Sequence, residues 1–136
     1  MIELYRSAFY ELSEDRRERV VTLARTAAPF LTHASVRAEV DRVVERFEPR
    51  HRELGIVVDM RSAPGRNDPE FEAAMRHLRF AVGQAFARVV VLVATASGQM
   101  QAARLHREGG FVYSISRDLI EARELASGMR EAAEAD

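Results

Sequence analysis

The sequence contains no cysteine and no tryptophan, and glycine and proline are scarce, with 7 and 4 residues among 136. The absence of cysteine excludes disulfides, thiolate nucleophiles and cysteine zinc sites. No basic-then-apolar leader opens the chain, and no apolar run is long enough to cross a bilayer. We therefore expect a cytoplasmic protein with no membrane partner.

An excess of charge of either sign is also missing. The chain has 20 basic and 21 acidic residues, and all of the basic residues are arginine. Nonspecific nucleic-acid binding needs a net basic surface, so we expect no nucleic-acid partner. The length is sufficient for one domain with a real core. We place that domain at residues 1–128 and expect the Ala- and Glu-rich residues 129–136 to fray.

The most informative stretch runs from Leu54 to Glu72. A short apolar run, Leu54 to Met60, is bounded by turn residues and predicts a strand covered on both faces. Asp68 followed by Pro69 is typical of a helix N-cap and first helical position. Ligands and partners of open α/β sheets meet the loops at the carboxyl ends of parallel strands. The turn between this strand and its helix is therefore the first place to look for function.

Apolar periodicity and turn residues predict a β-β-α-β-α-β-α-β-α order. The expected strands are residues 2–12, 20–27, 54–60, 89–94 and 111–115, and the expected helices are residues 35–47, 68–83, 99–107 and 116–126. Strands that alternate with helices favour a mixed, mainly parallel sheet, with an N-terminal β-hairpin as its antiparallel edge. The fold class is thus a single α/β domain with about four helices.

Residues 14–27 leave a choice between helix and strand. Ser13 followed by Glu14 and Asp15 could cap a helix, whereas the β-branched Val20 and Val21 favour a strand. We favour the strand. The aromatic residues of the first strand could also face outward there and form a homo-oligomer surface.

Four segments carry a resemblance to a known family. They are the strand that ends at Asp59, the turn into the helix at Asp68, the strand VVVLVATASG, and the late segment FVYSISRDLIEARELA. In this order they resemble the STAS (SpoIIAA-like) domain, the fold of anti-sigma-factor antagonists. The resemblance covers nearly the whole chain. It implies a STAS-like α/β fold and a regulatory protein that binds another protein.

The sequence departs from that family at one functional position. The family carries a phosphorylated serine at the start of the helix after the central strand. Asn67, Asp68 and Pro69 occupy this place here, and Ser62 lies several residues too early. Asp68 could mimic a permanently charged serine, but an N-cap is the simpler interpretation. We therefore expect binding that phosphorylation does not switch.

Two arginines flank the Pro-Gly turn beside the helix start. Arg61 and Arg66, with the N–H groups of the helix N-terminus, could bind a phosphate or a carboxylate, and Arg25 could join them. Alternatively, the two arginines pair with nearby acidic side chains and hold the turn rigid. The candidate binding residues of this turn are Arg61, Ser62, Arg66, Asn67 and Asp68.

Thr95, Ser97 and Gly98 form a second strand-to-helix turn. Such a turn can hold an anion through backbone N–H groups. No Rossmann or P-loop glycine pattern accompanies it, so an ordinary capped turn is favoured. We include these three residues among the candidate binding residues and expect no cofactor.

Catalytic and metal patterns are weak. None of the four histidines has metal-pair spacing, so no metal is expected, and His51 stands in a charged stretch where solvent exposure is expected. No G-x-S-x-G elbow occurs. We therefore expect a non-catalytic module rather than an enzyme.

Two functions remain to be distinguished. The favoured function is a regulatory module that binds another protein through residues 61–72 and 95–99. The alternative is a module that binds a nucleotide or other small anion through Arg61, Arg66 and the helix N-termini. A small-molecule function predicts a concave pocket behind those arginines, whereas a protein partner predicts a flat face with exposed apolar residues.

Overall fold

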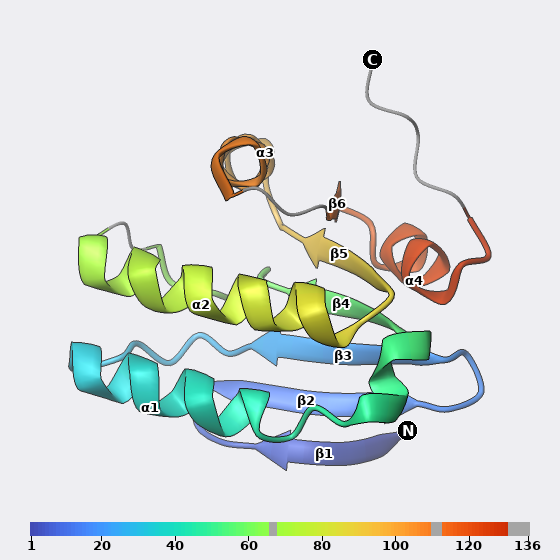
Figure 1. Ribbon diagram of the computed structural model, residues 1–136. Coiled ribbons are helices and arrows are strands. Elements are labelled where there is room, and N and C mark those ends of the chain that lie inside the picture. The colour runs from blue at the N-terminus through green and yellow to red at the C-terminus, as the bar shows by residue number, and fades with distance from the viewer. Residues whose placement is uncertain (66–67, 110–112, 131–136) are drawn as a thin grey trace.

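The computed structural model describes residues 1–65, 68–109 and 113–130 (Figure 1). The described residues form six strands, four α-helices and one short 3-10 helix. In chain order these are β1 (Ile2–Arg6), β2 (Tyr10–Asp15), β3 (Val20–Arg25), α1 (His33–Val44), η1 (Pro49–Glu53), β4 (Gly55–Asp59), α2 (Pro69–Ala85), β5 (Arg88–Leu92), α3 (Ala96–Gly109), β6 (Ser114–Ser116) and α4 (Leu119–Ser127). None of these helices is long and apolar enough to cross a bilayer.

The six strands form one mixed sheet in which spatial order equals chain order, β1-β2-β3-β4-β5-β6. The pairs β1–β2 and β2–β3 are antiparallel. The pairs β3–β4, β4–β5 and β5–β6 are parallel, and a helix connects the two strands of each pair. The predicted α/β class, with a mainly parallel sheet and an N-terminal hairpin, is confirmed.

The prediction of one strand over residues 2–12 is wrong, because the chain turns back after Arg6. The Ser7 hydroxyl accepts hydrogen bonds from the N–H groups of Phe9 and Tyr10, at 3.0 and 3.2 Å, and closes a tight turn. The second strand therefore extends to Asp15. Residues 2–15 therefore form two antiparallel strands, β1 and β2, where the hydrophobic pattern alone predicted a single strand.

Residues 20–25 form strand β3, as we favoured. Val20 to Arg25 pair with β2 on one side and with β4 on the other, so this segment lies inside the sheet. Arg19 precedes it with a φ of 61°, and this left-handed residue ends the β2–β3 turn.

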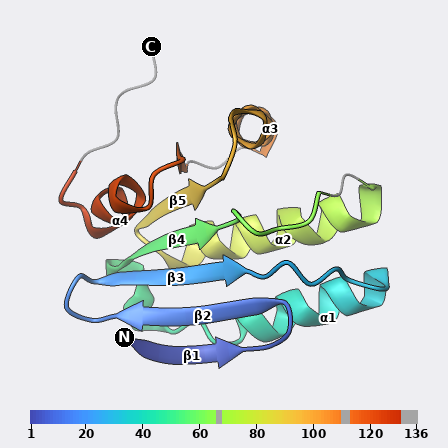
Figure 2. The same ribbon diagram turned by 180° about the vertical axis from the view of Figure 1, so that it is seen from behind.

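The helices cover the two faces of the sheet unequally. Helices α1 and α2 lie side by side on one face, and from behind the strands lie in front of them (Figure 2). The larger core fills this layer. Helix α4 packs on the opposite face, where Ala122 and Ala126 contact Val57, Val90 and other buried residues of a smaller core.

Three helix starts differ from the sequence-based prediction. Helix α3 begins at Ala96 rather than at residue 99, so Ser97 and Gly98 belong to the helix and not to the turn before it. Helix α1 begins at His33, because the Thr32 hydroxyl accepts from the Ser35 N–H at 3.1 Å and so forms the N-cap. Helix α4 is capped by Asp118 rather than by Ser116, since the Asp118 carboxylate accepts from the Glu121 N–H at 2.9 Å. Asp68 caps α2 as predicted.

His51 is fully buried, so the prediction that it is solvated is wrong. Its ring stacks on Phe86 with 5.3 Å between centroids, and its Nδ1 accepts from the Glu48 N–H at 3.0 Å. Nearby, the carboxylate of the buried Glu14 accepts two hydrogen bonds from Arg50, at 2.7 and 2.8 Å. These contacts of Glu14, Arg50 and His51 join strand β2 to η1.

The backbones of strand β4 and helix α4 approach each other closely at Gly55. A Cβ on Gly55 would lie 1.7 Å from the carbonyl oxygen of Ala126. The same carbonyl accepts a hydrogen bond from Arg88 Nε at 2.7 Å. Glycine at position 55 thus permits α4 to sit against the sheet.

Candidate functional site

A cavity of about 450 Å³ lies on the face of the sheet that α2 covers, beside strand β5. Its floor is formed by β4 and β5, and its walls by α2, by the first turns of α3 and by Tyr113 just before β6. After β4, Met60, Arg61 and the residues from Ala63 to Gly65 form part of its rim. The cavity therefore opens at the carboxyl ends of the two central parallel strands, where α/β folds commonly bind ligands.

The floor consists of valine side chains that no helix fully covers. Val58, Val89 and Val91 are only partly buried, although β4 and β5 each have a neighbouring strand on both sides. Their neighbours Val57 and Val90, on the opposite face, are buried beneath α4. The alternation of a strand thus places Val57 and Val90 in the smaller core and turns the other valines toward the cavity, where Val58 and Val89 also pack against the larger core.

The wall on α2 is mostly apolar. Phe71, Met75, Leu78 and Val82 recur at helical spacing and line the cavity. Met75, Leu78 and Val82 also belong to the larger core. One side of this stripe therefore contacts the core while the other borders open space.

Arg79 interrupts the apolar stripe. Its Nε is buried and has no hydrogen-bond partner among the described residues, and the side chain lines the cavity. Burial lowers the pKa of the Arg79 guanidinium because desolvation penalises the charged form, while Glu72 and Tyr113 act in the opposite direction. The same burial raises the pKa of the Tyr113 phenol, whose hydroxyl donates to the Ala102 carbonyl at 2.6 Å.

The rim contains four of the eight predicted binding residues. Thr95 precedes α3 and its hydroxyl accepts from the Gly98 N–H at 3.0 Å, so Ser97 and Gly98 stand in the first turn of the helix. Both of these residues, with Thr95 and Arg61, line the cavity. The two turns proposed from sequence therefore meet at one site.

Arg61 is already paired within its turn. Its Nε and Nη2 donate to the two carboxylate oxygens of Asp59, at 3.0 and 2.9 Å, and this raises the pKa of the guanidinium. For Arg61 the structure thus shows the predicted pairing with a nearby acidic side chain, and the expectation that such pairing holds the turn rigid stays a prediction. Arg25 does not join the site, because it is buried and donates to the carbonyls of Phe9, Thr26 and Ala28.

The other predicted residues lie elsewhere. Ser62 is exposed and does not line the cavity, and Asp68 caps α2. Arg66 and Asn67 fall outside the described residues. Arg79 was missed, although its position was visible in the sequence, since residues 71, 75 and 79 are spaced by four and share one face of a helix.

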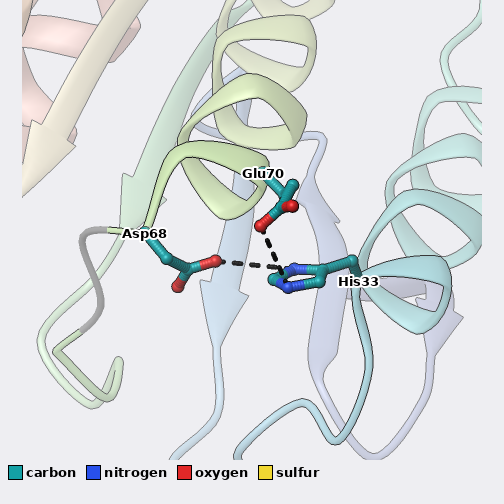
Figure 3. A group of neighbouring side chains, drawn as sticks. All are labelled: His33, Asp68 and Glu70. Carbon is teal, nitrogen blue, oxygen red and sulfur yellow. Dashed lines mark ion pairs between the residues drawn. The ribbon is translucent and has the colours of Figure 1, made fainter.

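A second cluster of polar side chains joins the starts of α1 and α2 (Figure 3). His33 Nδ1 lies 3.5 Å from an Asp68 carboxylate oxygen, and its Nε2 lies 3.1 Å from Glu70. One ligand atom from each residue lies within 4.8 Å of the others, so the three could hold a metal ion. Each ring nitrogen faces a different carboxylate, however, so the imidazole links the starts of the two helices. Histidine spacing in the sequence could not reveal this cluster, because the acids lie 35 or more residues away.

Replacing Asp68 with alanine is expected to lower the free energy of unfolding by about 1 kcal/mol, because α2 loses its N-cap. The Asp68 carboxylate accepts from the Phe71 N–H at 3.3 Å. Asp68→Ser keeps a capping oxygen and removes the charge beside His33, so it should cost only a few tenths of a kcal/mol. Urea denaturation of the two variants measures the difference. Equal losses in both would assign the effect to the charge instead of the cap.

The aromatic residues of the first two strands are engaged inside the molecule. The Tyr5 hydroxyl donates to the buried Glu39 at 2.9 Å, Phe9 stacks on Phe30 with 4.3 Å between centroids, and Tyr10 is fully buried. Tyr10 therefore cannot contribute to an outer surface, whereas Tyr5 and Phe9 stay partly exposed, and the homo-oligomer surface stays a prediction.

Comparisons with known proteins identify no relative. No family model matches the chain, and no curated protein or solved structure matches it either. The STAS resemblance therefore stays a prediction, and the site must be interpreted from its own geometry.

Proposed function

We propose that this protein is a non-catalytic module that binds a small, largely apolar molecule in the cavity between α2 and β5. The observation that carries the proposal is the uncovered valine floor. Val58, Val89 and Val91 line a space of about 450 Å³, within the range of roughly 300–1,000 Å³ typical of small-molecule sites. Exposure of apolar surface to water is unfavourable by about 25 cal/mol per Å². An apolar ligand that covers the valines removes this surface from water, and the gain favours binding.

The rim favours an apolar ligand over a nucleotide. A polyphosphate needs several free cationic or N–H donors, but Asp59 already occupies the Arg61 guanidinium. The Gly98 N–H at the start of α3 is bound by the Thr95 hydroxyl. Within the described part of the two turns, the Arg61 guanidinium and the Gly98 N–H are thus satisfied inside the protein.

Filling the floor is expected to abolish binding. Val91→Phe places an aromatic ring in the cavity, so saturable binding of 1-octanol should be lost, whereas Gln84→Phe, which adds the same ring at an exposed position of α2, should leave it unchanged. Amide chemical shifts of the ¹⁵N-labelled protein report both binding and folding. In the wild type, the shift changes should concentrate in α2, β5 and the start of α3. Octanol binding that Val91→Phe leaves intact would refute the proposed site.

A regulatory protein-binding module is the second candidate. Exposed apolar side chains favour it, since Met100 on α3 and Phe80 on α2 are 74% and 58% exposed. A protein partner that uses these residues should be lost on Met100→Gln and retained on Val91→Phe. The opposite pattern is expected for a small ligand.

A further inference from the structure

The charged side chains that line the cavity differ in whether they form an ion pair within the protein. Arg61, Glu72 and Arg79 are the charged residues among the described lining. Asp59 holds Arg61 in a two-point ion pair. Arg79 has no ion pair within the described part of the chain, and its Nε lacks any hydrogen-bond partner there. Among the described lining residues, Arg79 is therefore the cation without an ion pair, and its buried Nε is a donor without a protein acceptor.

An unused buried donor of this kind is unfavourable in the empty protein. A buried polar atom without a partner loses its hydration and gains nothing in return, and the penalty is larger for a charged group. Arg79 also lies about two turns along α2 from Phe71, so it stands on the wall beside the apolar floor and not in the rim turn with Arg61. A ligand that reaches the floor thus meets this guanidinium.

We propose that the ligand is an apolar monocarboxylate, with its carboxylate bound by Arg79 and its hydrocarbon part on Val58, Val89 and Val91. This inference rests on the proposed small-molecule function and names its ligand class. A guanidinium presents paired N–H donors that match the two oxygens of a carboxylate.

The surrounding charges favour a single anionic group. Glu72 lines the same cavity and would repel a second negative charge on the ligand. Arg61 cannot offset that charge without leaving Asp59. A dicarboxylate or a phosphate ester with two negative charges is therefore disfavoured relative to a single carboxylate, which places only one negative charge in the cavity beside Glu72.

Calorimetric titration at pH 7 with octanoate and 1-octanol tests the inference. Both probes carry an eight-carbon chain, and they differ in the charge of the head group. Hexanoate, octanoate and decanoate should bind progressively more tightly, by about fourfold for each added methylene, as long as the chain stays on the apolar floor.

The decisive variant is Arg79→Met, which keeps a long apolar side chain and removes the charge. It should weaken octanoate binding at least tenfold, the size expected for a charge-assisted hydrogen bond in a desolvated site, and change 1-octanol binding by less than threefold. Arg76→Met, an exposed position on the same helix, is the matched control and should affect neither probe. Arg79→Lys should restore part of the octanoate affinity.

A second measurement uses the wild type alone. The carboxyl carbon of bound [1-¹³C]octanoate should titrate at a lower pH than that of free octanoate, because a neighbouring cation favours the ionised form. A bound carboxyl that titrates at a higher pH would overturn the inference even if Arg79→Met fails to fold. Equal losses of octanoate and octanol binding in Arg79→Met would overturn it too. If the inference fails in either way but the wild type still binds 1-octanol, the proposed small-molecule function stands. If the wild type shows no saturable binding of either probe, the proposed function itself has failed.

Discussion

Gly55→Ala is expected to lower the free energy of unfolding by about 3 kcal/mol or more. The new Cβ would stand 1.7 Å from the Ala126 carbonyl oxygen and 2.4 Å from its carbon, and both are backbone atoms that cannot rotate away. Overpacking inside a close-packed core costs about 1–3 kcal/mol when only side chains adjust. Here α4 must move as a whole, and the move also breaks the hydrogen bond from Arg88 Nε to Ala126. Urea denaturation followed by circular dichroism gives the change.

Gly65→Ala is the matched control. Apart from its chain neighbours, no described residue has an atom within 4 Å of a Cβ at this position, so this variant should unfold within about 0.5 kcal/mol of the wild type. If Gly55→Ala proved as stable as Gly65→Ala, α4 would not pack against β4 as described.

Glu14→Gln is expected to destabilise the protein by about 2–3 kcal/mol at pH 7. Glu14 is 2% exposed and its carboxylate accepts two hydrogen bonds from Arg50, at 2.7 and 2.8 Å. Glutamine keeps the shape but offers one acceptor oxygen and no charge, so Arg50 loses a charge-assisted bond. The exposed neighbour Glu11→Gln, on the same strand, should change stability by less than about 0.5 kcal/mol.

The same pair predicts a dependence of stability on pH. The Arg50 hydrogen bonds hold the pKa of Glu14 below its ordinary value of 4.5. The unfolded chain therefore binds a proton at a higher pH than the folded chain does. The stabilisation is complete above pH 4.5 and is lost as the pH falls through the lower folded pKa, so wild type and Glu14→Gln should converge in acid. A stability difference that stays constant down to pH 2.5 would contradict this assignment.

His51 adds a separate effect at higher pH. Burial lowers its pKa below the ordinary value of 6.5, so the folded chain resists protonation and stability falls as the pH drops below 6.5. The Glu14 step is therefore resolved only below pH 4.5.

The sequence predicted the elements whose signals are local and strong. Asp68 before Pro69 placed the start of α2 correctly, because capping chemistry depends on adjacent residues alone. The β-branched residues of 20–25 correctly favoured a strand. The break after Arg6 was missed, because the Ser7 hydroxyl makes that turn without any glycine or proline to mark it.

The site was predicted less completely, for a physical reason. Polar turn residues can be found in a sequence, and Thr95, Ser97 and Gly98 do reach the cavity rim. Whether a valine of a central strand is covered or left open depends on how helices from distant segments pack. The burial of His51 and the isolation of Arg79 depend on the same long-range packing.

Intermolecular nuclear Overhauser effects between bound octanoate and the methyl groups of the labelled protein test the central claim most directly. We predict contacts from the hydrocarbon chain to Val89, Val91 and Met75, which line the cavity. The exposed apolar residues Ile120 and Met129, 71% and 83% exposed, are the competing surface. Contacts to those two residues, with none to the valines, would contradict a ligand site between α2 and β5.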